Sequence, residues 1–121
     1  MRIIFSVFQK DKSDLVNHCN HFEAMQDLER QGIDYSILEG VYKGTKELSF
    51  ETKSVLTGLA LARKYDQESV LTIDSENRAV LDYGFRNKIN LGQWVETTKD
   101  IAEKQDSYSY HPVTNKYFIT K

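Results

Sequence analysis

Short apolar runs separated by polar turns dominate the hydrophobic pattern of this chain. Residues 2–8 are rich in β-branched and aromatic side chains and end at a polar cluster, which is typical of a buried strand followed by a loop. Turn residues at 43–45, 74–78 and 112–115 each separate two such runs and predict three hairpins. The predicted extended segments are residues 2–8, 35–42, 47–50, 69–73 and 79–83, a strand near Trp94, and residues 108–110 and 117–119.

Two further stretches carry apolar residues at spacings of three and four and therefore predict amphipathic helices. In the first, Ser13 or Asp14 can cap the N-terminus, and Gly32 ends the helix. Its predicted packing stripe consists of Leu15, Cys19, Phe22, Met25 and Leu28. The second helix begins at about Thr52, and its stripe consists of Val55, Leu56, Leu59, Ala62 and Tyr65.

The order strand, helix, two strands, helix, strand predicts an α+β fold of the ferredoxin-like type. In this split βαβ sandwich an antiparallel sheet carries both helices on one face, and in this chain a C-terminal hairpin follows. With 121 residues we expect one domain over residues 1–121, whose thin core leaves little room for a deep pocket within one chain. A ligand site is therefore expected at a subunit interface.

The charge and the cysteine content of the chain exclude some classes of binding partner and indicate a cellular compartment. Sixteen basic and eighteen acidic residues give a formal net charge of -2, which lacks the basic excess of a general nucleic-acid binder. The single Cys19 excludes an intrachain disulfide and a multi-cysteine zinc site, and it favours a reducing, cytoplasmic location. No apolar run has the length of a signal-peptide core or a membrane span, so we expect no membrane partner.

Three residues of the first predicted helix are of types that bind metals or act as nucleophiles. His18 and His21 are three positions apart and can share one face, but no third ligand accompanies them, which favours a solvated helix face over a metal site. Cys19 belongs to the predicted packing stripe, so it is interpreted as a small core residue rather than a nucleophile.

The densest group of chemically distinctive residues occupies positions 39–50. Two glycines, Gly40 and Gly44, flank Tyr42 there, and glycine allows a backbone to approach a ligand closely. The segment is not a phosphate-binding loop, because Lys43 precedes the second glycine and no helix begins at the required place. From spacing alone, the simplest interpretation is a hairpin with charged surface residues.

Several short motifs nevertheless follow one another along nearly the whole chain. They are Ser6-Val7-Phe8, Asn17 at the start of the first helix, the segment Gly40-x-Tyr-x-Gly-x-x-Glu47-x-Ser-Phe, Gln67-Glu68-Ser69-Val70-Leu71, Gly84, and the terminal aromatic hairpin. In this order they make the chain resemble the bacteriophage S-adenosylmethionine lyases, formerly described as S-adenosylmethionine hydrolases, and related small bacterial proteins.

This resemblance implies a homotrimer of ferredoxin-like subunits, similar to the PII signalling proteins, with ligand bound in clefts between subunits. It also implies that one carboxylate, Glu47, is essential. The resemblance places Tyr42 and Ser49 beside it, Ser6 and Phe8 along the same cleft, and Glu96 as a second carboxylate.

The implied reaction needs neither a metal nor a redox cofactor, because the sulfonium of S-adenosylmethionine already makes methylthioadenosine a good leaving group. The substrate's own carboxylate attacks its γ-carbon and gives homoserine lactone, so the enzyme mainly orients the methionine tail. Glu47 could hold the adenosine hydroxyls or the cationic part of the substrate, and tyrosine rings suit adenine or a sulfonium. The activity would deplete the methyl donor of host restriction and methylation systems in a bacterial cytoplasm.

Two alternatives stay open at this point. The same intersubunit cleft could belong to a non-enzymatic, PII-like module that senses or sequesters an adenine-containing ligand. The protein could also inhibit a host factor through its surface, although no sequence feature supports this specifically.

Overall fold

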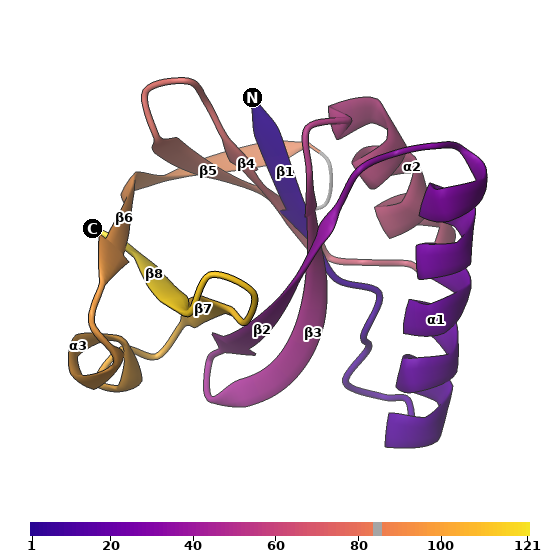
Figure 1. The fold of residues 1–121 in the computed structure, drawn as a ribbon, viewed down its shortest axis with the longest axis horizontal. Coiled ribbons are helices and arrows are strands. Elements are labelled where there is room, and N and C mark those ends of the chain that lie inside the picture. The colour runs from indigo at the N-terminus through magenta and orange to yellow at the C-terminus, as the bar shows by residue number, and fades with distance from the viewer. Residues whose placement is uncertain (84–85) are drawn as a thin grey trace.

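The computed structural model describes residues 1–83 and 86–121, whose strands form a closed antiparallel barrel (Figure 1). The strands are β1 (Arg2–Phe5), β2 (Ser36–Tyr42), β3 (Thr45–Thr52), β4 (Ser69–Ile73), β5 (Arg78–Tyr83), β6 (Asn87–Thr97), β7 (Tyr108–His111) and β8 (Lys116–Thr120). The helices are α1 (Asp14–Arg30), α2 (Val55–Lys64) and α3 (Lys99–Glu103). Around the barrel the strands follow the order β1-β3-β2-β7-β8-β6-β5-β4, and β4 again borders β1.

The prediction of an open ferredoxin-like, PII-like sandwich is wrong, because the sheet does not end at its fourth strand. From β4 the sheet continues through β5, β6, β8 and β7, and β7 then pairs with β2. An open sheet would leave the backbone groups of β2 and β4 unpaired along its two edges, whereas closure gives both strands a second neighbour. The closing pairs include Glu39 with Tyr110 and Val41 with Tyr108.

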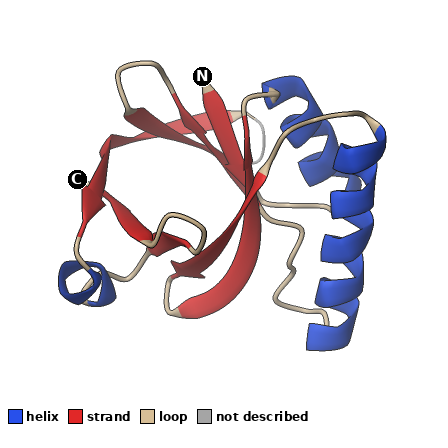
Figure 2. Cartoon of the chain, in the orientation of Figure 1, coloured by secondary structure: helices blue, strands red, loops and turns tan. Residues whose placement is uncertain are grey.

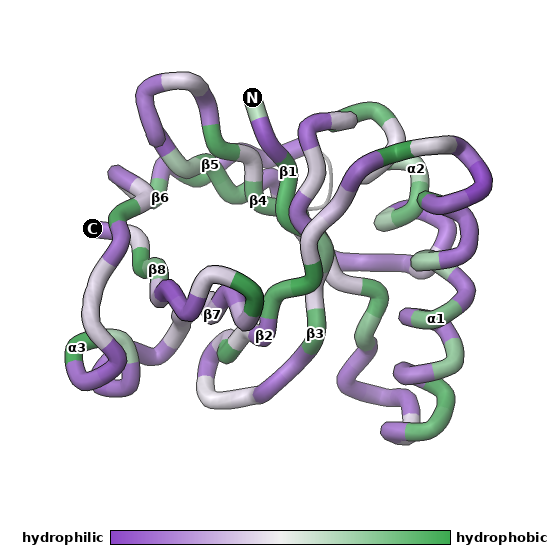
Figure 3. Tube along the Cα trace, viewed as in Figure 1, coloured by the Kyte–Doolittle hydropathy of each residue, from purple (hydrophilic) through white to green (hydrophobic). Residues whose placement is uncertain are grey.

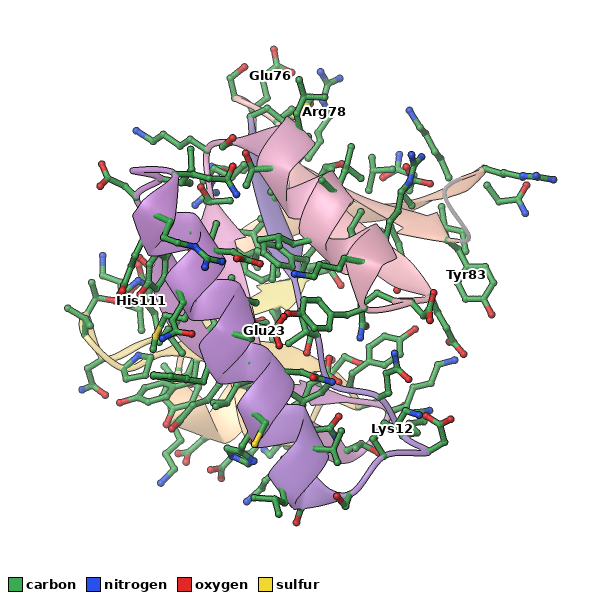
Figure 4. All side chains as sticks on the ribbon, turned by 90° about the vertical axis from the view of Figure 1, so that its right-hand side faces the viewer. Lys12, Glu23, Glu76, Arg78, Tyr83 and His111 are labelled. Atoms are coloured by element: carbon green, nitrogen blue, oxygen red, sulfur yellow. The ribbon has the colours of Figure 1, made fainter. Side chains whose placement is uncertain are left out.

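The two longer helices, α1 and α2, lie together outside the barrel, and α3 lies on the opposite side (Figure 2). Lys64 of α2 connects them, because its Nζ lies 3.1 Å from Asp27 Oδ2 and 3.3 Å from Glu23 Oε1 on α1. Figure 4 views this helical face, with Glu23 labelled on α1. None of the helices in the described chain combines the length and the apolar character needed to cross a membrane.

Strand β1 separates two hydrophobic cores, because successive side chains of a strand point to opposite faces of the sheet. The core between the barrel and the helices contains Ile3, Phe5, Val7, Ala24, Leu28, Phe50, Leu61, Ala62, Tyr65 and Val70. The core inside the barrel contains Ile4, Leu38, Ile73, Ala79 and Trp94, with Leu71, Leu91 and Phe118 packed against it. Hydrophobic stretches on β1, β4 and β5 contrast with the hydrophilic turn between β4 and β5 (Figure 3).

Helix α1 begins as predicted, because the Ser13 side chain accepts a hydrogen bond from the backbone N–H of Val16. The predicted packing stripe is largely wrong. Leu28 is buried and Met25 packs against the core, but Leu15 is 74% exposed, Phe22 is 55% exposed and Cys19 is exposed. The interpretation of Cys19 as a core residue is therefore also wrong.

The face of α1 that is buried instead is partly polar and consists of Asn17, His21, Ala24, Asp27 and Leu28. Its polar members have specific neighbours: Asn17 bonds to the segment before the helix, Asp27 pairs with Lys64, and His21 stacks on Phe50. These contacts allow polar residues to occupy the buried face. Of the two histidines predicted on a solvated face, His18 is exposed but His21 is buried.

Helix α2 packs unusually close to β1 at a glycine. A Cβ atom at Gly58 would lie 2.6 Å from Ile3 Cγ2, which is closer than real side chains approach. Ala62 and Tyr65 of the predicted stripe are buried, whereas Leu56 is 82% exposed, so that part of the prediction is wrong. The absence of a side chain at Gly58 thus sets how closely this helix covers the barrel wall.

Candidate functional site

A cavity of about 620 Å³ extends into the barrel interior. Its inner wall, here called the floor, is apolar and consists of Ile4, Leu71, Leu81, Leu91, Trp94 and Phe118. Four exposed charged residues also line the cavity and are here called the rim. They lie on the segments that follow β1 and α2 and are Lys10, Asp11, Asp66 and Glu68. The expectation that one chain has little room for a pocket is thus not met, because barrel closure creates an interior.

The segment after β1 lies at one end of the molecule. Figure 4 shows Lys12 of this segment near the lower end and Glu76 with Arg78, from the turn between β4 and β5, at the upper end. At that upper end Arg2 Nη1 lies 2.8 Å from Glu51 Oε1, and Arg2 Nη2 donates to Asn77 Oδ1 at 3.3 Å. The charged rim therefore belongs to the end opposite this polar cluster.

Five of the six predicted site residues line the cavity. They are Ser6 and Phe8 after β1, Tyr42 at the end of β2, and Glu47 and Ser49 on β3. Alternation along β3 explains the last two, because Phe50 between Ser49 and Glu51 is buried in the other core, toward the helices. The structure thus brings these five residues together, while their roles in binding or catalysis stay predictions.

The sixth residue, Glu96, is not among the described residues that line the cavity. It is exposed on β6, and its Oε1 lies 3.5 Å from Lys116 Nζ on the neighbouring strand β8. Gly84, which contributes to the family resemblance, lies outside the described residues.

The side chain of Glu47 is half-buried, and its carboxylate has neither a hydrogen bond nor an ion pair with any residue that the structure describes. Burial raises the pKa of its carboxyl group, and the positive charge of Lys10 at the rim lowers that pKa to a smaller extent. A carboxylate with free acceptor atoms in a cavity can receive hydrogen bonds from ligand hydroxyls or lie near a ligand cation.

The space beside Glu47 is open because its partner across the β2–β3 ladder is Gly40. A Cβ atom at Gly40 would find only ordinary contacts, 3.6 Å from the Glu47 carbonyl oxygen and 3.8 Å from that of Tyr108. The hairpin ends in a two-residue turn in which Lys43 and Gly44 both have positive φ, as a tight hairpin connection requires. Gly40 is therefore not required by close packing, and it leaves room for a ligand.

Ser6 and Phe8 hold the segment between β1 and α1 against the barrel. Ser6 Oγ donates to the Leu48 carbonyl oxygen at 2.7 Å and accepts a hydrogen bond from the Phe8 N–H at 3.1 Å. The Phe8 ring meets His18 and His21 of α1 edge-on, with ring centroids 5.2 Å and 6.0 Å apart. The Ser6 hydroxyl is thus already used to shape the cavity entrance.

Sequence reasoning assigned no site role to several residues that shape the entrance. Asn17 Nδ2 donates to the Gln9 carbonyl oxygen at 3.0 Å, and Asn17 Oδ1 accepts from the Gln9 N–H at 2.9 Å. Gln67 Nε2 donates to the Phe8 carbonyl oxygen at 2.6 Å, and Gln9 Nε2 donates to the Tyr65 carbonyl oxygen. Asn17 and Gln67 belong to the motif series, but nothing in the sequence shows these long-range bonds.

Comparison with known proteins agrees with the motif series. A search of curated proteins finds no match. The model of the S-adenosylmethionine lyase family matches residues 3–121, which include every residue of the floor and the rim. Because this match spans nearly the whole chain, the chain belongs to the S-adenosylmethionine lyase family.

Proposed function

We propose that this protein degrades S-adenosylmethionine in the barrel cavity and releases methylthioadenosine and homoserine lactone. Family membership supports an activity on S-adenosylmethionine in general. The observation that carries the proposed site is the half-buried Glu47 carboxylate, which faces the cavity without a hydrogen-bonding partner among the described residues.

The proposed reaction balances without an added reagent. A carboxylate oxygen of the substrate forms a bond to its γ-carbon, the bond between that carbon and sulfur breaks, and sulfur keeps the electron pair. A carboxylate and a sulfonium are thereby converted into an uncharged ester and an uncharged thioether. No proton, metal or redox cofactor is required by this balance, so the main task of the protein is to fold the methionine tail into the attacking geometry.

The loss of charge during the reaction restricts the role of Glu47. A carboxylate in contact with the sulfonium would stabilise the substrate more than the transition state, because the positive charge on sulfur disappears as the bond breaks. Only interactions that are stronger in the transition state accelerate the chemical step. Glu47 is therefore assigned to the ribose hydroxyls, which it can orient without stabilising the reacting charge.

The product assay tests this proposal directly. Purified protein incubated with S-adenosylmethionine should release methylthioadenosine and homoserine lactone, separated by chromatography. Glu47→Gln should lower turnover at least 100-fold while the melting temperature stays close to that of the wild type. Glu39→Gln is the matched control, because Glu39 is an exposed carboxylate on the neighbouring strand β2 outside the cavity lining.

Two outcomes would contradict parts of the proposal. A folded wild-type protein that binds S-adenosylmethionine without releasing product would favour the non-enzymatic binding module. Wild-type turnover by Glu47→Gln would reject the site assignment and leave the activity in place.

The proposal extends to assembly and biological setting. We expect a homotrimer in a bacterial cytoplasm, where depletion of the methyl donor would counter host restriction during phage infection. Exposed apolar side chains on α1, Leu15 and Phe22, are available for contact between subunits. A native mass of three times 14.1 kDa would support the trimer, and a monomer at working concentration would reject it.

A further inference from the structure

The floor of the cavity is apolar and contains two aromatic rings, those of Trp94 and Phe118. Trp94 is 8% exposed, and its ring stacks on that of Phe118 with 5.4 Å between centroids and 6° between planes. Aliphatic side chains complete this surface, and none of its six members is charged. Such a surface binds planar, weakly polar groups through stacking and apolar contact.

The rim has the opposite character. Lys10 supplies a positive charge, while Asp11, Asp66 and Glu68 supply negative charges, and all four residues are exposed to solvent. Their segments are held in place, because Gln67 bonds to the Phe8 carbonyl oxygen. A zwitterionic group can therefore find partners of both signs at the rim while it keeps part of its hydration.

We propose that the floor, and Trp94 with Phe118 in particular, binds the purine base of the substrate, whereas the rim receives its amino-acid end. This inference rests on the proposed function. The reverse orientation would bring an ammonium group and a carboxylate against six uncharged apolar residues, and burial of unpaired charges is strongly unfavourable. In the proposed orientation Glu47, on β3, receives the ribose that joins the two ends.

The sequence provides a direct reporter for this orientation, because Trp94 is the single tryptophan of the chain. Adenosine and methylthioadenosine should each change the tryptophan fluorescence saturably, because each carries the base. Methionine at the same concentrations should leave the fluorescence unchanged. Saturable quenching by methionine together with no response to adenosine would overturn the proposed orientation.

A pair of variants on β8 tests the floor independently. Phe118→Leu removes the ring that stacks on Trp94 and should weaken methylthioadenosine binding at least 10-fold by calorimetry. Tyr117→Leu is the control, because its ring packs against that of Tyr110 at a tilt of 33°, with centroids 4.5 Å apart, and Tyr117 lies outside the cavity lining. Equal losses of affinity in both variants would reject a specific role of the floor. The wild-type fluorescence titration decides the question if Phe118→Leu does not fold.

The product assay on the same preparation separates the two proposals. If the wild type cleaves S-adenosylmethionine but adenosine does not change Trp94 fluorescence, the floor assignment fails and the proposed function stands. If adenosine and methylthioadenosine bind at the floor but S-adenosylmethionine is not cleaved, the proposed function fails and the base-binding floor stands.

Discussion

His21 should make the stability of the fold depend on pH. Its imidazole is 7% exposed and stacks on Phe50, with ring centroids 4.3 Å apart and an angle of 11° between planes. Neither ring nitrogen has a hydrogen-bonding partner in the part of the chain that the structure describes. Burial, with a smaller contribution from the charge of His18, lowers the pKa of His21 from 6.5 to about 4.

The sign and size of the effect follow from these two pKa values. Between about pH 6.5 and pH 4 the unfolded chain binds a proton at His21 that the folded protein excludes. The free energy of unfolding therefore falls as the pH decreases through this window and does not change at this site above it. The difference between a pKa of 6.5 and a pKa of about 4, at about 1.4 kcal/mol for each tenfold change in proton affinity, corresponds to a loss of about 3–4 kcal/mol.

Urea unfolding at a series of pH values measures this dependence. His21→Leu removes the titrating group with little change in volume, so its free energy of unfolding should decrease less toward acidic pH than that of the wild type. Toward acidic pH, the free energy of unfolding of the wild type should decrease by up to about 3–4 kcal/mol more than that of His21→Leu. Comparison of the two curves cancels the titration of carboxylates, which both proteins share.

His18→Gln serves as the control, because His18 is exposed on the same helix and causes only the smaller part of the shift. This variant should keep most of the pH dependence of the wild type. Parallel stability curves for the wild type and His21→Leu would refute the conclusion that the buried imidazole excludes a proton.

Three further variants test packing, space and charge. Gly58→Ala should lower the free energy of unfolding by about 1–3 kcal/mol in urea titrations, because the added Cβ would overlap Ile3. Unchanged stability would show that α2 can move away from β1. Gly40→Val should weaken methylthioadenosine binding at least 10-fold by calorimetry without lowering the melting temperature, and unaltered affinity would place the ligand elsewhere. The Lys10 charge lowers the pKa of Glu47, so Lys10→Met should raise that pKa and shift the acidic limb of the pH–rate profile to higher pH. A shift to lower pH would contradict this electrostatic assignment.

Local structure was predictable where short-range chemistry determines it. Ser13 caps α1 through a bond within the same turn, and Lys43 with Gly44 adopts the positive φ values of a tight hairpin. The buried face of α1 was not predictable, because Asn17 and His21 are polar residues whose partners lie on other elements. Hydrophobic periodicity favours Leu15 and Phe22 instead, although both are exposed.

Long-range pairing explains why the architecture was missed. The pairing of Gly40 with Ser109 closes the barrel, and alternation within β2 or β7 is the same whether or not the two strands meet. The clustering of motif residues around one cavity depends on this closure. In the sequence nothing distinguishes Trp94 and Phe118 from ordinary core residues. Only the three-dimensional structure places them on the floor of the cavity.

The same closure links refolding to ligand binding. The β1–β4 pairing and the closing β2–β7 pairing each join residues 71 positions apart, Arg2 with Ile73 and Glu39 with Tyr110. Such distant pairings form slowly, because bringing the ends of a long loop together costs entropy before the contacts form. Glu47 lies on β3, whereas Trp94 and Phe118 lie on β6 and β8, beyond the β2–β7 pairing. A refolding chain should therefore bind ligand only after these slow pairings have formed.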